Sequence, residues 1–234
     1  MTASLLLRFK APMQSWGDRS RYSSRDTRPY PTKSGVLGLL AAAKGIRRTD
    51  DIEELAELLF AVRVDQPGSV LHDYQTAERW QTGGKTSLIS RYYLSDAVFV
   101  AAVQAEHREL LEELEACLKN PRFPLYLGRR SCPANPDLVI DVVDGGAVNT
   151  LKELPWQAQK AHRRRRPGEV ILPIYHDAPP DDPDGDPRQD VPLSFDPRNR
   201  QYGWRSVKQT DSSPIDNPDG SSVSDPFFEA VVSA

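Results

Sequence analysis

The sequence has few of the residues that build disulfide frameworks, metal sites and membrane spans. It holds 2 cysteines among 234 residues, and Cys117 and Cys132 lack the spacing of a zinc site or a disulfide scaffold. Its 4 histidines are scattered singly. No apolar run approaches the roughly 18 residues that a membrane-spanning helix needs, and the short apolar N-terminus does not resemble a secretory signal. We therefore expect a cytoplasmic protein with no metal, no cofactor and no membrane contact.

The formal net charge of −3 hides an asymmetry along the chain. Residues 1–48 carry ten basic side chains against two acidic ones, whereas residues 177–234 carry five basic and twelve acidic. A local basic patch attracts a polyanion even when the whole chain is slightly acidic. The amino-terminal part is therefore the expected nucleic-acid surface, and the acidic end is expected to face protein.

Hydrophobic periodicity and turn residues predict an α+β domain over residues 1–145. The expected elements are strand 4–9, helix 35–45, helical run 52–60, strand 61–65, strand 70–76, strand 94–103, helix 106–118 and strand 137–143. A hairpin at about 79–91, with Gly83 and Gly84 at its centre, is expected to project as a thumb. Taken in order, these elements are typical of the ferredoxin-like β-α-β-β-α-β pattern.

Residues 146–234 are expected to form a smaller, irregular and β-rich C-terminal extension. Its Pro- and Asp-rich stretch at about 177–192 predicts a flexible loop, and the tail after Asp211 is expected to be poorly ordered. The basic run at 163–166 is compatible with two interpretations, a solvated face and a cluster that binds phosphate.

Two segments near the front of the chain combine a tryptophan with a helix start. Residues 11–17 (APMQSWG) place Trp16 in a basic loop, and residues 31–40 (PTKSGVLGLL) follow. Thr32 or Ser34 offers a cap for the helix. Free N–H groups at a helix N-terminus, beside Lys33, suit a phosphate.

A third segment, residues 125–133 (LYLGRRSCP), has the composition of an RNA-binding loop. Gly128 allows close backbone approach, Tyr126 can stack on a base, and Arg129 and Arg130 can pair with phosphates. The alternative for all three segments is a set of packed turns with surface arginines.

The stretches LLLRFKAPMQSWG, PTKSGVLGLLAAAKGI, FAVRVDQPG, LHDYQT and YLGRRSCP occur in this order over residues 4–133. Together they resemble the family-five CRISPR-associated RAMP proteins of type I-E Cascade complexes. The resemblance implies a non-catalytic subunit that grips the repeat-derived 5′ tag of the guide RNA and caps the backbone filament. The implied partners are the guide RNA, the large PAM-reading subunit, the neighbouring backbone subunit and target DNA held by the assembled complex. The residues expected to bind RNA are Gln14, Trp16, Arg25, Lys33, Ser34, Trp80, Gln81, Thr86, Ser87, Arg91, Tyr126, Gly128, Arg129 and Arg130.

Two other functions remain open. Type I-C relatives of this family resemble it in fold but cut repeat RNA without a metal, using a tyrosine, a lysine and a histidine. Tyr30 lies near the place expected for that tyrosine, but residues 90–93 read Ser-Arg-Tyr-Tyr where the lysine and histidine should follow. A general acid–base mechanism near neutral pH then lacks its proton carrier. A protein-binding scaffold is the third possibility.

Overall fold

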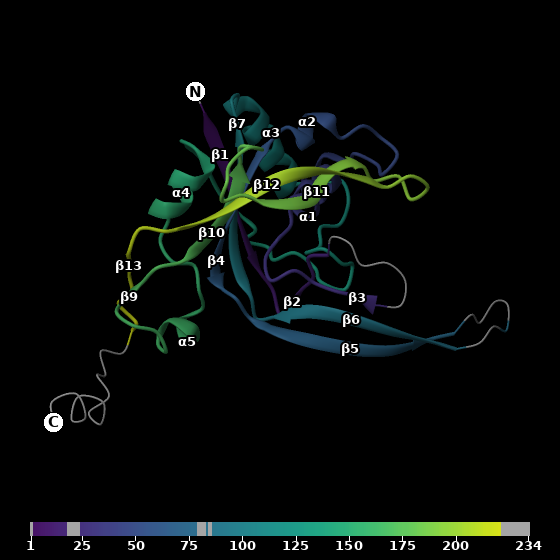
Figure 1. Cartoon of the computed structure of the whole chain (residues 1–234), viewed down its shortest axis with the longest axis horizontal. Helices are drawn as coiled ribbons and strands as arrows, with labels where there is room; N and C mark the ends of the chain where they lie inside the picture. Colours follow the sequence, from purple (N-terminus) through teal and green to yellow (C-terminus); the bar gives the residue numbers. More distant parts are fainter. Residues whose placement is uncertain (1, 18–23, 79–82, 84–85, 221–234) are drawn as a thin grey trace.

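The protein is built on one seven-stranded sheet from which a long hairpin projects, as a computed structural model shows (Figure 1). The structure describes residues 2–17, 24–78, 83 and 86–220. All neighbouring strands of the main sheet are antiparallel. Their order is β11 (Asp186–Ser194), β12 (Gln201–Asp211), β10 (Pro173–Ala178), β4 (Leu59–Gln66), β7 (Val98–Ala105), β1 (Ala3–Lys10) and β8 (Val139–Asp144). The predicted mixed α+β class is confirmed, and the structure shows that the sheet is antiparallel.

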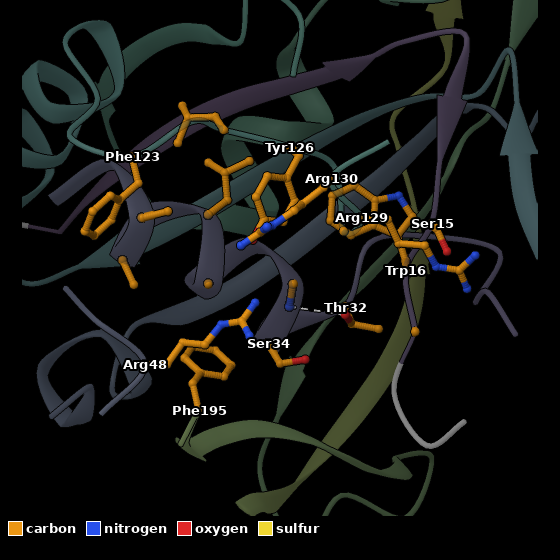
Figure 2. Close-up of a pocket in the computed structure, with 18 of the residues that line it drawn as sticks. Ser15, Trp16, Thr32, Ser34, Arg48, Phe123, Tyr126, Arg129, Arg130 and Phe195 are labelled. Atoms are coloured by element: carbon orange, nitrogen blue, oxygen red, sulfur yellow. Dashed lines mark hydrogen bonds between the residues drawn. The ribbon is translucent and has the colours of Figure 1, made fainter. Parts of the chain in front are cut away.

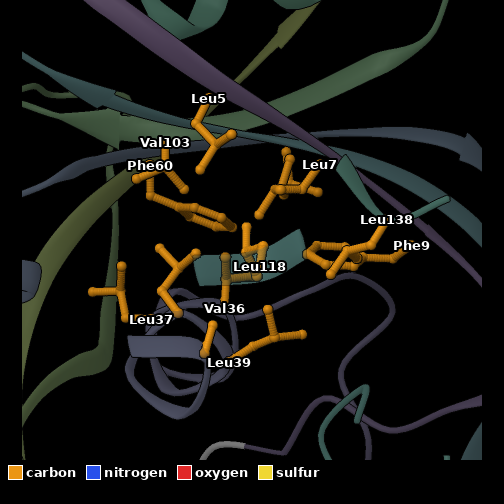
Figure 3. Packing of buried hydrophobic residues seen from close by; sticks show 14 of the residues in the cluster. Leu5, Leu7, Phe9, Val36, Leu37, Leu39, Phe60, Val103, Leu118 and Leu138 are labelled. Carbon is orange, nitrogen blue, oxygen red and sulfur yellow. The ribbon is translucent and has the colours of Figure 1, made fainter. Parts of the chain in front are cut away.

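Helices cover both faces of this sheet. On one face, α1 (Lys33–Lys44) and α3 (Arg108–Lys119) pack over Leu5, Leu7 and Phe9 of β1 to form the main core (Figure 3). On the other, α4 (Ala147–Glu153) packs over Leu6. Strand β1 therefore buries side chains on both faces, which explains why its sequence is a continuous apolar run.

Helix α1 begins and ends where its capping residues predict. The Thr32 side chain accepts a hydrogen bond from the Gly35 N–H, and Gly45 ends the helix in the left-handed conformation, with φ 88°. The predicted helical run 52–60 is mostly wrong. Only α2 (Glu53–Ala56) is helical, and Leu59 and Phe60 instead begin β4, where they pair with β7.

The thumb is longer than the predicted hairpin at 79–91. Strands β5 (Ser69–Ala77) and β6 (Ser87–Ser95) pair from Ser69↔Ser95 to Ala77↔Ser87, so the hairpin spans 69–95 (Figure 1). The predicted strand at 70–76 belongs to this hairpin and not to the main sheet. Two short strands, β2 (Met13–Gln14) and β3 (Ser24–Arg25), join β6 near its base.

Residues after 146 extend the main sheet through β10, β12 and β11. The loop predicted at 177–192 is shorter in the structure, because β10 continues to Ala178 and β11 begins at Asp186. Strand β11 lies at the edge of the sheet, and its pairing with β12 contains register shifts. Edge strands and bulges tolerate proline, which is why a proline-rich stretch that resembles a loop can form this strand. A small separate sheet joins β9 (Glu169–Val170) to β13 (Ile215–Asp216), next to α5 (Lys160–Arg163). In the part of the chain that the structure describes, no helix meets the length and apolarity of a membrane span.

Candidate nucleic-acid interface

An open groove of about 1680 Å³ runs beside α1 and is walled by segments that are far apart in sequence (Figure 2). One wall is the loop around Ser15 and Trp16, another is the segment 123–133, and a third comes from Phe195 to Tyr202. The groove therefore brings together the three segments that the sequence singled out and adds a fourth from the C-terminal half.

The groove is strongly basic. Among the described residues, seven arginines and one acidic side chain, Asp26, line it. The arginines are Arg25, Arg47, Arg48, Arg91, Arg129, Arg130 and Arg200. A concave surface lined by one sign of charge focuses its potential and concentrates ligands of the opposite sign. The groove is therefore built for a polyanion.

Aromatic rings are interleaved with these arginines. Phe123, Tyr126, Phe195 and Tyr202 all line the groove, and Phe123 is 38% exposed. Phosphates pair with guanidinium groups, whereas unstacked bases pack on aromatic faces. The combination of both is typical of surfaces that bind single-stranded nucleic acid.

The loop at 125–133 is held tightly to the front of the chain. Leu127 donates its N–H to the Cys132 carbonyl at 2.7 Å, and accepts a hydrogen bond from the Ser15 N–H at 3.1 Å. Gly128 has φ 84°, and a Cβ at this position would overlap the Ser15 backbone carbonyl. Close backbone approach was the predicted role of Gly128. The segment that approaches it within the described chain is the loop at Ser15.

Arg129 already makes contacts within the protein through part of its guanidinium. Its Nη2 donates to the Arg25 carbonyl at 2.8 Å, and its guanidinium lies over the Tyr93 ring, 4.7 Å from the centroid. Its buried Nη1 has no partner among the described residues. Burial raises the pKa of Tyr93, but hydrogen bonding to Ser131 and to Arg129 outweighs it and lowers the pKa overall. Arg130, in contrast, is exposed at the groove.

Gln14 and Trp16 do not present the surfaces that their predicted RNA contacts require. Gln14 is fully buried and donates to the Ala97 carbonyl at 2.8 Å, and its Oε1 accepts from the Trp16 indole at 3.2 Å. Trp16 is 1% exposed, with its ring 5.2 Å from that of Phe9. Both are core residues that support the wall of the groove, because an indole so enclosed has no free face for a base.

The start of α1 is already neutralised by the protein itself, which corrects the prediction that it binds a phosphate there. Asp190 accepts a hydrogen bond from the Lys33 N–H at 2.9 Å, so a carboxylate occupies the position expected for an anion. The Lys33 ammonium, 6% exposed, pairs with Asp177 at 3.1 Å. Arg205 closes the cluster by pairing with both Asp177 and Asp190. Ser34 is buried and lines the groove from the same helix turn.

The remaining predicted residues are divided between the groove and the thumb. Arg25 of β3 lies opposite Arg91 of β6 in the strand register, and both residues line the groove. Thr86 and Ser87 are exposed at the far end of the thumb and do not line the groove. Trp80 and Gln81 lie outside the described residues.

Sequence reasoning did not assign the far side of the groove to the site. Its residues are Arg47, Arg48, Phe123, Phe195, Arg200 and Tyr202. The excess of basic residues over 1–48 pointed to Arg47 and Arg48. No local signal marked Phe195 or Arg200, which reach the groove because β11 and β12 join the sheet beside α1.

Residues 4–208 match the family described as the CRISPR-associated protein Cas5. The chain is 37% identical over 159 residues to the CRISPR system Cascade subunit CasD of Escherichia coli (strain K12), covering 60% of this chain and 71% of that one. A solved CRISPR RNA-guided surveillance complex contains a chain with TM-score 0.77 and 30% identity, covering 98% of both chains. A crystal structure of a Cas protein matches with TM-score 0.65 and 35% identity, over 93% of this chain and 97% of that one.

Proposed function

Because the chain belongs to the CRISPR-associated Cas5 family, we propose that it is the guide-RNA-binding subunit of a type I-E Cascade surveillance complex. The similarity to CasD and to a chain of a surveillance complex supports a place in such an assembly. In this proposal the groove grips the repeat-derived 5′ tag of the guide RNA, and the subunit caps the backbone filament in the cytoplasm. Its neighbours are the large PAM-reading subunit and the adjacent backbone subunit.

The observation that carries the proposal is that seven arginines and several aromatic rings line the same open groove. An RNA tag offers both phosphates and splayed bases, and each stacked base contributes about 1–3 kcal/mol. The strand order β4-β7-β1-β8, with α1 following β1 and α3 following β7, also supports the ferredoxin-like arrangement of RAMP proteins.

The test combines recovery of bound RNA with its affinity. The tagged protein is purified from cells that carry its CRISPR array and neighbouring genes, and the bound RNA is sequenced end to end. The variant Arg129→Ala/Arg130→Ala removes two groove arginines. A matched control, Arg122→Ala/Arg198→Ala, removes two exposed arginines that do not line the groove.

We expect guide RNAs that share one repeat-derived 5′ end, recovered together with other subunits and reduced in the groove variant only. With a purified tag oligonucleotide, the slope of log affinity against log salt should fall by about 1–1.5, because each phosphate on a single strand contributes about 0.7. An unchanged slope, or an equal loss in the control, would contradict the proposed groove.

We further propose that the subunit is not a nuclease. Tyr30, the residue that the alternative requires, stacks on Tyr175 with ring centroids 4.0 Å apart. Burial raises the pKa of Tyr30, while Arg188, Arg205 and Arg28 lower it only in part. Arginine stays protonated near neutral pH, so these side chains cannot exchange a proton as a general acid or base. If Tyr30→Phe abolished the formation of the tag's 5′ end, the nuclease alternative would replace this proposal.

A further inference from the structure

The basic run at Arg163–Arg166 lies outside the groove. It occupies the end of α5 and the turn that follows, and none of its residues lines the groove. Figure 1 shows α5 with β9 and β13 on the opposite side of the molecule from the far ends of β5 and β6. RNA binding in the groove therefore does not explain why these four arginines are present.

The backbone of the run is held in place from the side of the small sheet. Asn217, 3% exposed, donates its side-chain amide to the carbonyls of Arg163 at 2.9 Å and Pro167 at 2.7 Å. The Asn217 N–H also donates to the Gly168 carbonyl at 2.7 Å. The turn is thus fixed by a buried side chain, and the arginines that it carries project from an ordered base.

Three of the four arginines have no side-chain partner within the described part of the chain. Arg163 pairs with Asp219 at 2.9 Å, and Lys160 reaches the same carboxylate at 3.7 Å. Arg164, Arg165 and Arg166 are exposed, and no side-chain hydrogen bond or ion pair joins them to any residue that the structure describes. Glu169 and Asp216 are Cα partners between β9 and β13. Among the residues that the structure describes, these three adjacent guanidinium groups therefore have no ion-pair partner.

We propose that Arg164, Arg165 and Arg166 form a second nucleic-acid contact, which binds the phosphate backbone of a duplex without reading its sequence. Forked guanidinium donors match phosphate oxygens. Near the run in sequence, the described residues expose one large hydrophobic side chain, the aliphatic Ile171 at 58%, and no aromatic ring, whereas protein interfaces centre on clusters of aromatic and apolar anchors. The same lack of exposed aromatic rings distinguishes the patch from the groove, because single strands bind by stacking and a duplex does not need it. The inference goes beyond the proposed grip on the RNA tag and does not depend on it.

The test compares two triple variants that remove the same charge from different places. Arg164→Ser/Arg165→Ser/Arg166→Ser removes the patch, and Arg47→Ser/Arg48→Ser/Arg200→Ser removes one side of the groove. Each full-length protein is titrated against a short fluorescein-labelled DNA duplex of arbitrary sequence, and separately against a single-stranded tag RNA, over a series of salt concentrations. Thermal unfolding confirms that each variant is folded.

For the patch variant we expect the salt slope of duplex binding to fall by about 2–3, since each phosphate contact on a duplex contributes about 0.9. Its RNA slope should be unchanged, and the groove variant should show the reverse pattern. Should the serine variant unfold, the variant Arg164→Lys/Arg165→Lys/Arg166→Lys, which keeps the charges, should retain most of the duplex slope.

A patch variant with an unchanged duplex slope would overturn the inference, as would an equal loss of duplex binding in the groove variant. If the patch variant binds duplex normally but fails to assemble with its partner subunits, the patch is a protein contact and the inference is also wrong. The proposed grip on RNA fails by a different result, namely an unchanged RNA slope in the groove variant.

Discussion

Gly128 lies directly against the backbone carbonyl of Ser15, so that a Cβ at position 128 would overlap that oxygen. This contact joins the segment 125–133 to the front of the chain, which is how two distant stretches come to share one groove. The contact is between backbone atoms, and no rotation of a side chain can relieve it.

We therefore expect Gly128→Ala to destabilise the protein by more than about 2 kcal/mol, since strain at positive φ adds to the overlap. Denaturation by urea measures the change. Gly168→Ala is the control, because nothing lies within 4 Å of a Cβ at that position and its φ is outside the left-handed region. It should change the free energy of unfolding by less than about 1 kcal/mol. Equal effects of the two substitutions would show that Gly128 is not a point of close contact.

Two glycines of α1 should respond in opposite directions to the same substitution. A Cβ at Gly35 would lie 2.9 Å from the Trp16 ring, whereas a Cβ at Gly38 would lie 3.4 Å from Phe195. Gly35→Ala should cost about 1–3 kcal/mol, because the enclosed indole cannot move away. Gly38→Ala should be neutral or stabilising by up to about 1 kcal/mol, because alanine favours the helix. Thermal unfolding of both variants checks the contrast, and a destabilised Gly38→Ala would contradict it.

The buried charge cluster at the start of α1 should depend on Asp190. This carboxylate, 6% exposed, pairs with Arg205 and accepts the hydrogen bond from the Lys33 N–H. Asp190→Asn should cost about 3–5 kcal/mol, because it leaves Arg205 with a poorly compensated buried charge. Asp186→Asn is the matched control on the same strand, where the carboxylate is 75% exposed and should contribute less than about 1 kcal/mol. Chemical denaturation of both variants makes the comparison, and equal costs would show that the cluster is not tightly coupled.

The position of Arg129 over Tyr93 predicts a shift in tyrosine ionisation. Hydrogen bonding to Ser131 and Arg129 lowers the pKa of Tyr93 against the opposing effect of burial, whereas burial raises the pKa of Tyr30. Tyr93 should therefore ionise at lower pH than Tyr30, because its phenolate is stabilised by nearby donors. In Arg129→Ala the pKa of Tyr93 should rise.

Absorbance titration of the phenolate measures this order, with Tyr93→Phe and Tyr30→Phe assigning the two transitions. The control Arg122→Ala, which removes an arginine outside the groove, should leave the Tyr93 transition in place. If the Tyr93 transition does not move in Arg129→Ala, the Arg129 guanidinium does not lower the pKa of Tyr93 and the prediction is wrong.

The elements that could be predicted from the sequence are those specified by local chemistry. Thr32 and Gly45 cap α1, and the helical spacing of the leucines specifies α3, because both signals depend on neighbours within one or two turns. The thumb was predicted too short because the residues of β5 read equally as a core strand. Only pairing with β6 decides where they belong.

The same distinction applies to the candidate site. Composition alone indicated a basic front end, and Tyr126, Gly128, Arg129 and Arg130 could be picked out from one short stretch. Trp16 has the same side chain whether it stacks on a base or packs against Phe9, and only the packing of α1 against it shows that it is enclosed. Lys33 looked like a phosphate ligand until the fold placed Asp190 beside it, from a strand 157 residues away.

Residue chemistry therefore determined by itself that this protein has a basic front end with arginine-rich loops and one capped helix. The tertiary structure decided which of those side chains face the groove, which are neutralised by distant carboxylates and which are enclosed in the core. The physical reason is that burial and ion pairing depend on long-range strand order. Strands β10, β11 and β12 place Asp177, Asp190 and Arg205 at the start of α1. The local sequence around Lys33 does not predict these contacts.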